Sequence, residues 1–307
     1  MSERMSAKST ENSNPTTDTP EKKIAAFFDL DRTIIAKAAM SAFKSPLHSH
    51  GLLSKRSVLS IVIGELIYLH LGATRARIEK FGRSGARLVK GKNKSEICQI
   101  IEEAVHQVVD PIIYSEALKL IEFHKSQNHL IVLVSASPEE IVQPLAKLLN
   151  ADLVIASKAD TDQTGRYTGN IEFLAVGTKK ADAIVQLAQN MNIDLAQSYA
   201  FTDSITDIPM LEIVGHPTAI NPDRALEKLA EIRGWDIDEF VEPINLSVRI
   251  KNVKKTVTDR YSKPTAILSL LPTITILAIC AFIYVLSRSK AQERKYLHQS
   301  PSDIVIF

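Results

Sequence analysis

Residues 24–33 read IAAFFDLDRT, a short apolar run that ends in two aspartates and a threonine. The run has the length and aromatic content of a buried strand, so we expect a β-strand over 24–30. Asp29 and Asp31 would then lie where this strand ends, and in open α/β sheets ligands bind at the carboxyl ends of the strands. Two carboxylates at such a place suit a nucleophile paired with a general acid–base, although the same pattern also serves in turns and helix caps.

The chain on either side of this motif alternates between short apolar runs and helical patterns. Further strands are expected over 129–134, 152–156, 198–202 and 217–220. Helices are expected over 113–127, 138–149, 179–191, 206–213 and 222–233. Buried strands that alternate with helices indicate an α/β fold with a parallel sheet covered on both faces. Residues 165–173, GRYTGNIEF, combine turn residues with β-formers and predict a small hairpin.

Residues 34–112 interrupt this alternation, because they are helical in pattern and contain no comparable strand. Within them, residues 57–71 are very apolar but short for a bilayer, and they contain Glu65. We therefore favour a buried helix of a cap over a membrane contact for this segment. The whole stretch predicts a helical cap inserted after the first motif.

A second acidic motif, TDSITDIPML, follows the expected strand 198–202 and contains Asp203 and Asp207. With Asp29 and Asp31 it would bring four carboxylates to one edge of the sheet, where they would repel one another. A hard divalent cation such as Mg²⁺ would relieve this repulsion, since it binds carboxylates, waters and phosphate. The alternative is that Asp203 or Thr202 caps a helix and that Asp207 lies on a solvated face.

Two further strand ends contain groups that could hold a phosphate. Ser135 ends the strand in IVLVSASPEE, and Ser137 is a natural N-cap of the helix that follows. In AVGTKKADAI, Lys179 and Lys180 open a helix, where a positive charge opposes the helix dipole and could instead serve a phosphoryl group. Simple solvent exposure of either lysine is the alternative.

Taken together, these motifs resemble those of the haloacid dehalogenase-like phosphohydrolases. DLDRT resembles the first motif Asp-x-Asp-x-Thr, Ser135 the second, Lys180 (or Lys179) the third, and Asp203 with Asp207 the fourth. The helical insertion resembles the cap of the branch that includes phosphoserine phosphatase. The resemblance covers about residues 24–240. It implies a Rossmann-like core over 24–38 and 128–240 and a cap over 39–127.

The resemblance also implies a role for each matching residue. Asp29 would attack phosphorus and form an aspartyl-phosphate, while Asp31 would protonate the leaving alcohol and later activate water. Ser135 and Lys180 would hold the phosphoryl oxygens. The implied cofactor is Mg²⁺. Its ligands would be the carboxylates of Asp29 and Asp203 and the backbone carbonyl of Asp31, with Asp207 nearby.

The sequence differs from that of phosphoserine phosphatases at one place that concerns the substrate. Phosphoserine phosphatases carry a glutamate shortly after the first motif, whereas the corresponding stretch here, IIAKAAMSAF, contains Lys37 and no acid. This difference argues against an amino-acid substrate. The cap instead contains a basic run, which is either a solvated helix face or a surface attracted to anionic headgroups: Arg75, Arg77, Lys80, Arg83, Arg87, Lys90, Lys92 and Lys94. A phospholipid-type phosphate and a phosphoserine-like small metabolite both remain candidate substrates.

The two ends of the chain differ from the middle. Residues 1–23 are polar and lack aromatic residues, so we expect a disordered tail that is not a signal peptide. Residues 264–287 contain no charge and are long enough to cross a bilayer, and basic residues flank them. We expect a single-pass transmembrane helix there, a basic linker over 241–263 and a short tail over 288–307. Six basic residues before the span and four after it favour a cytoplasmic catalytic domain.

Composition excludes several classes of protein. The net charge of +2 argues against a nucleic-acid partner, and two cysteines exclude a disulfide scaffold and a cysteine-based zinc site. The sequence therefore predicts a membrane-anchored, Mg²⁺-dependent phosphomonoester hydrolase. A membrane-tethered module that binds phosphate without catalysis is the alternative, and the sequence leaves the oligomeric state open.

Overall fold

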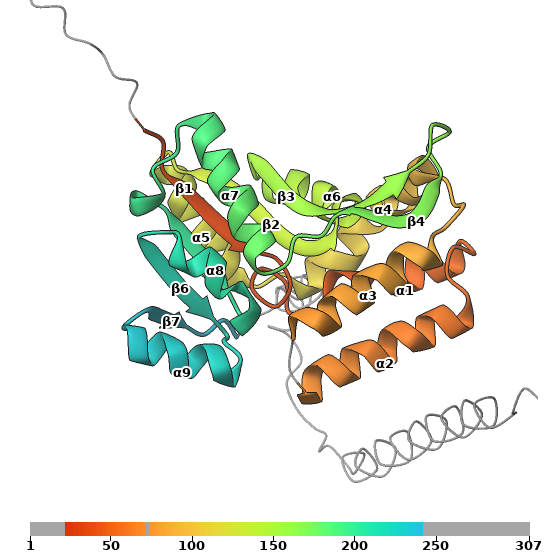
Figure 1. Cartoon of the computed structure of the whole chain (residues 1–307), viewed down its shortest axis with the longest axis horizontal. Coiled ribbons are helices and arrows are strands. Elements are labelled where there is room, and N and C mark those ends of the chain that lie inside the picture. The colour runs from red at the N-terminus through yellow and green to blue at the C-terminus, as the bar shows by residue number, and fades with distance from the viewer. Residues whose placement is uncertain (1–21, 72–73, 242–307) are drawn as a thin grey trace, which may run out of the picture. The chain divides into compact units, whose positions relative to one another are not determined.

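The computed structural model describes residues 22–71 and 74–241 of the chain, and its centre is one twisted sheet (Figure 1). Within these residues the strand order is β4-β3-β2-β1-β5-β6-β7, and all neighbours are parallel except β3 and β4. The strands are β1 (Ala25–Asp29), β2 (Leu130–Pro138), β3 (Leu153–Thr161), β4 (Tyr167–Phe173), β5 (Tyr199–Thr202), β6 (His216–Ile220) and β7 (Asp236–Asp238). The predicted α/β class with a mostly parallel sheet is confirmed.

Strand β1 occupies the middle of the sheet, and all five of its residues are buried. Asp29 lies in register with Val134 of β2, and Phe28 lies in register with Phe201 of β5. The carboxyl ends of the three central strands therefore meet at one edge. This register brings the polar residues that follow the three strands together.

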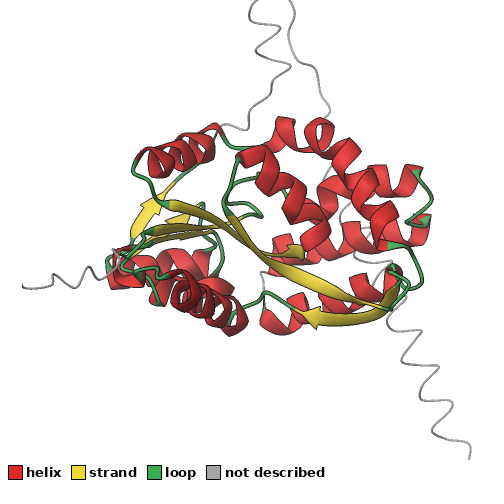
Figure 2. Ribbon diagram, turned by 90° about the horizontal axis from the view of Figure 1, so that it is seen from above, coloured by secondary structure: helices red, strands yellow, loops and turns green. Residues whose placement is uncertain are grey.

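Helices cover both faces of the sheet, which Figure 2 shows from above. Alternate β1 residues point to opposite faces, so that Phe27 and Phe28 belong to two separate apolar clusters. The cluster around Phe27 includes residues from the helices α7 (Thr178–Met191), α8 (Ile208–Glu212) and α9 (Arg224–Arg233). The cluster around Phe28 includes residues from α5 (Ser115–Ser126) and α6 (Glu139–Leu149).

The insertion after β1 is helical, as predicted. It consists of α1 (Ala39–Ser49), α2 (Lys55–Leu71), α3 (Arg75–Leu88) and α4 (Lys94–Val109), followed by the 3₁₀ turn Asp110–Ile112. Helix α1 packs against α2 and α4, α3 packs against β4, and α4 packs against α6. Helix α5 packs against β2 instead.

Other elements also differ from expectation. The segment 165–173 is not a separate hairpin, because β3 continues to Thr161 and pairs with β4 as the antiparallel edge of the main sheet. Strand β7 was not predicted. Over residues 55–64, whose side chains the structure describes, helix α2 is only partly buried, since Leu59 is 58% exposed.

Most of the expectations for the chain ends lie outside the described residues. These include the transmembrane helix over 264–287, the short tail, nearly all of the linker and most of the N-terminal tail. In the part of the chain that the structure describes, none of the helices combines the length and the apolar character that a membrane span requires.

Candidate active site

A buried lysine joins two of the predicted acids. The Lys180 Nζ donates to Asp29 Oδ1 and to Asp207 Oδ2, both at 2.6 Å. Asp207 Oδ2 also accepts from the Thr202 hydroxyl at 3.0 Å. All of these residues are at most 5% exposed. The two carboxylates raise the pKa of Lys180, against the effect of its burial, so the ammonium stays charged.

Asp31 faces a different set of donors. Its carboxylate accepts from the backbone N–H of Ala39 at the start of α1 (2.5 Å), from Ser137 Oγ (2.9 Å) and from Ser135 Oγ (3.3 Å). Burial raises the pKa of Asp31 above its ordinary value, and the three hydrogen bonds oppose this rise only in part. A carboxyl whose pKa is raised is suited to deliver a proton near neutral pH.

The remaining acid, Asp203, is buried at 5% exposure. Burial and the nearby Asp29 carboxylate raise its pKa well above the ordinary value, while Arg32 lowers it. Burial likewise raises the pKa of Asp29 to about 7, although Lys180 lowers it. Negative charge at this edge is therefore only partly compensated.

These contacts test whether the site suits Mg²⁺. Among residues 22–71 and 74–241, no three His, Cys, Asp or Glu side chains are grouped so as to hold a metal ion. Lys180 donates to Asp207 and to one oxygen of Asp29, and other donors engage the Asp31 side chain. Asp29 and Asp203 repel each other, and two carboxylates with additional oxygen ligands are the donor set that Mg²⁺ ordinarily takes. The fit rests on these two side chains rather than on four.

The structure decides between several alternatives that the sequence leaves open. Lys180 is buried within the site, whereas Lys179 is exposed. Asp203 does not cap a helix, because Ser204 caps the 3₁₀ turn Ile205–Asp207. Asp207 is 4% exposed and does not lie on a solvated face.

Ser137 differs from expectation. The N-cap position of α6 is Pro138, and no side chain caps this helix, so the prediction of Ser137 as N-cap is wrong. Its hydroxyl instead holds Asp31, while its backbone N–H donates to Ser135 Oγ at 3.0 Å. Its place two residues after Ser135 in the same SAS stretch was the available signal.

A cavity of about 380 Å³ opens from these groups toward the cap. Asp29, Asp31, Lys180 and Asp203 line one part of it, and apolar cap side chains line most of the rest. The volume lies within the range of about 300–1,000 Å³ that is usual for small-molecule sites.

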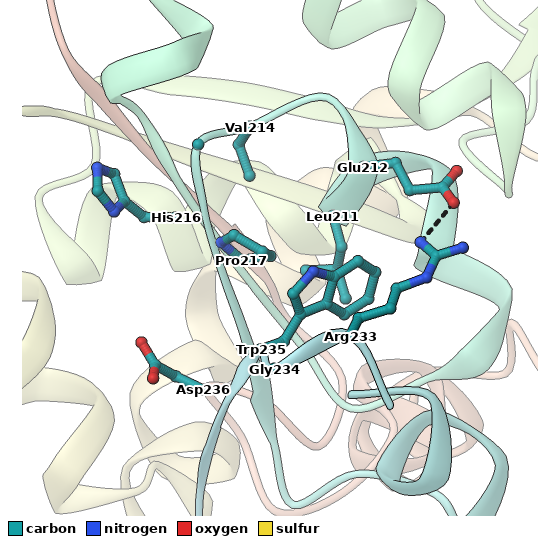
Figure 3. A pocket seen from close by; sticks show the side chains of 10 residues that line it. Leu211, Glu212, Val214, His216, Pro217, Arg233, Gly234, Trp235 and Asp236 are labelled. Atoms are coloured by element: carbon teal, nitrogen blue, oxygen red, sulfur yellow. Dashed lines mark hydrogen bonds and ion pairs between the residues drawn. The ribbon is translucent and has the colours of Figure 1, made fainter. Parts of the chain in front are cut away.

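A second hollow, of about 530 Å³, lies around β6 and β7 (Figure 3). Its most prominent charged groups are already paired: Arg233 donates to Glu212 at 2.6 Å, and its guanidinium lies 4.9 Å from the centre of the Trp235 ring. The hollow lacks the buried pairing of acid and lysine found at the end of β1, which makes the latter the better candidate for catalysis.

The model of the family "haloacid dehalogenase-like hydrolase" matches residues 26–212. The "Inhibition of morphological differentiation protein" of Streptomyces azureus is 42% identical over 228 residues, which cover 74% of this chain and 82% of that protein. Phosphoserine phosphatase SerB1 of Mycobacterium tuberculosis (strain ATCC 25618 / H37Rv) is 31% identical over 220 residues, 70% of each chain.

Solved structures share the fold. The structure of a phospho-aspartyl intermediate analogue of phosphoserine phosphatase superposes with a TM-score of 0.54 at 17% identity, covering 75% of this chain and 99% of that chain. At this identity the match concerns the fold alone.

Proposed function

The chain belongs to the haloacid dehalogenase-like hydrolases and is a phosphatase, and from this premise we propose that it cleaves phosphomonoesters through an aspartyl-phosphate on Asp29. The observation that carries the proposal is the buried contact between Asp29 and Lys180. The neighbouring Asp31 has a raised pKa, which suits a proton donor. A nucleophile, a cation for the phosphoryl group and a proton donor lie around one cavity.

In the proposed first step, a carboxylate oxygen of Asp29 attacks phosphorus, and the bond from phosphorus to the alcohol oxygen breaks. The Asp31 carboxyl gives its proton to that oxygen. The Lys180 ammonium then stabilises charge on the phosphoryl oxygens. The Ser135 hydroxyl, which donates to Asp31 in this structure, turns to a phosphoryl oxygen when substrate is bound.

In the second step, Asp31 takes a proton from a water molecule, whose oxygen attacks the phosphorus of the aspartyl-phosphate. Cleavage of the acyl phosphate frees Asp29 and inorganic phosphate, and Asp31 is protonated again. Asp29 and Asp203, with the backbone carbonyl of Asp31, would hold Mg²⁺. When bound, the ion supplies positive charge that favours an ionised Asp29 and screens the phosphate dianion.

We also propose a location, which rests on sequence alone. The uncharged segment 264–287 would anchor the protein in a membrane with the catalytic unit on the cytoplasmic side. Resistance of the full chain to extraction from membranes by alkaline carbonate supports the anchor. Release of the chain into the soluble fraction contradicts it.

The activity is tested on the full chain with p-nitrophenyl phosphate and Mg²⁺. Lys180→Met is expected to lower kcat/KM by about 100- to 1,000-fold, since it removes the cation that contacts the nucleophile. Lys179→Met, the exposed neighbour, is the matched control and is expected to retain activity. Equal loss in both variants contradicts the assignment of Lys180.

The intermediate is tested separately. Asp29→Asn is expected to abolish turnover, and Asp31→Asn to slow breakdown of the intermediate so that a phosphorylated chain is detected by mass spectrometry after acid quench. Full turnover by Asp29→Asn excludes this nucleophile. Binding of phosphate by the wild-type protein without turnover of any ester would indicate the non-catalytic module instead.

A further inference from the structure

The cavity beside the catalytic groups is apolar beyond them. Its wall contains side chains from the α1 helix and the loop after it, from α3 and from the segment after β4, such as Leu47, Leu52, Ile78, Phe81 and Leu174. Phe81 is 43% exposed, so the wall reaches the surface of the cap. A phosphate bound at Asp29 would therefore point its alcohol portion into an apolar space.

Among the residues that the structure describes, the same wall offers no free carboxylate for a substrate ammonium group. Apart from the catalytic aspartates, Glu140 is the acid among the described lining residues. It accepts a hydrogen bond from the Tyr167 hydroxyl at 2.6 Å, and Lys94 Nζ lies 3.6 Å from it. Because its charge is already compensated, an amino-acid phosphate would bury its ammonium group unpaired, which is costly.

Gly64, Gly82 and Gly85 of the cap helices line the cavity, and they differ in what surrounds them. Gly64 of α2 leaves room for the Phe81 ring, whose nearest atom lies 2.5 Å from where a Cβ would stand. A Cβ placed on Gly82 of α3 would likewise lie 3.0 Å from the nearest side-chain atom of Leu174. A Cβ on Gly85, which also lines the cavity, would meet nothing within 4 Å. A larger side chain at Gly85 would therefore enter free space rather than collide with a neighbour.

We propose that the substrate is the phosphomonoester of an apolar, chain-like alcohol, whose phosphoryl group binds at Asp29 and whose chain lies along this cavity. The inference rests on the proposed phosphomonoesterase activity and adds the class of the leaving alcohol. It follows from the continuity of the apolar wall with the catalytic groups and from the absence of a free acid among the described lining residues.

The first test compares ethyl, butyl and hexyl phosphate as substrates of the full-length protein below their micellar concentrations. Burial of one methylene group in an apolar site raises affinity about fourfold. We therefore expect kcat/KM to rise at least about tenfold from the ethyl to the hexyl ester. Phosphoserine is expected to be turned over more slowly than butyl phosphate. Equal values for the three alkyl esters, or a preference for phosphoserine, would overturn the inference and leave the proposed activity intact.

The second test narrows the cavity. Gly85→Phe is expected to lower the hexyl-to-ethyl ratio of kcat/KM at least about tenfold, and Gly85→Ala, which adds one methyl group at the same helical position, to lower it much less. A ratio that Gly85→Phe leaves at the wild-type value contradicts the assigned path of the chain.

A binding measurement separates this inference from the proposed function. Ethyl- and hexylphosphonate, which cannot be hydrolysed, are titrated into the full chain by calorimetry in the presence of Mg²⁺. Tighter binding of the hexyl compound supports the apolar site even if no ester is cleaved, and that outcome would contradict the proposed function alone. Equal binding of both phosphonates contradicts the apolar site.

Discussion

Replacing Asp29 by Asn is expected to reduce the pH dependence of folding stability in metal-free buffer. Burial raises the pKa of Asp29 to about 7 in the folded protein, against an ordinary value of 3.8 in the unfolded chain. Between these two values the folded protein holds a proton on Asp29 that the unfolded chain has lost. Raising the pH through this window therefore lowers the free energy of unfolding, by about 1.4 kcal/mol per pH unit.

From pH 5 to pH 7 the wild-type protein is thus expected to lose about 2–3 kcal/mol of stability through Asp29. The Asn side chain cannot ionise, so this contribution disappears in the variant. The substitution also removes the charge that raises the pKa of Asp203, so the contribution of Asp203 in the same direction becomes smaller. Asp31, whose pKa burial also raises, keeps its own contribution in the variant. The profile of the variant should therefore be flatter than that of the wild type by about 1 kcal/mol per pH unit between pH 5 and pH 7.

The assay is urea unfolding at pH 5, 6, 7 and 8 in EDTA, followed by fluorescence. Trp235 is the single tryptophan of the chain and lies just before β7, so its emission reports on the catalytic unit. Asp162→Asn is the control, because hydrogen bonds from Thr164 and Arg166 lower the pKa of this exposed carboxyl and place its titration below the window. Parallel profiles for Asp29→Asn and the wild type would refute the reasoning.

The remaining predictions concern two buried hydroxyl groups and the metal ion. The Thr33 hydroxyl is buried without a hydrogen-bond partner among the described residues, whereas the Thr202 hydroxyl donates to Asp207. Thr33→Val is therefore expected to raise the free energy of unfolding and Thr202→Val to lower it. Each change is expected to be about 1 kcal/mol, measured by urea unfolding at pH 7. A change of the same sign in both variants would contradict the assignment of their hydroxyls. Chelation of Mg²⁺ is expected to abolish activity reversibly, and Asp203→Asn to raise the Mg²⁺ concentration for half-maximal activity at least about tenfold; full activity in EDTA would exclude the cofactor.

Local sequence patterns were sufficient to predict most of the elements of the core. Each central strand is a short apolar run, and its polar successor lies at the strand end because parallel strands expose these ends at one edge. Asp29, Ser135 and Asp203 could therefore be assigned to one site before the register of β1 with β2 and β5 was known. The choice of Lys180 over Lys179 stays a prediction, which the burial of Lys180 favours.

What escaped prediction depends on contacts between distant segments. Ser137 has the sequence of an N-cap, yet its hydroxyl turns to Asp31, which is far from it along the chain. The DID stretch of β7 has no apolar run and becomes a strand only by pairing with β6. The apolar cavity is formed by α1, α3 and the segment after β4 together, so the sequence of any one of these segments does not predict it.

The hydrogen bond from Ala39 to Asp31 links proton affinity to the position of the cap. Because this N–H belongs to the first residue of α1 and lowers the pKa of Asp31, any displacement of α1 would raise the proton affinity of that carboxyl. By reciprocity, an ionised Asp31 would hold α1 in place and a protonated one would release it. Each loss of the proton from Asp31 during turnover would therefore strengthen the attachment of the cap to the end of β1, and each return of the proton would weaken it.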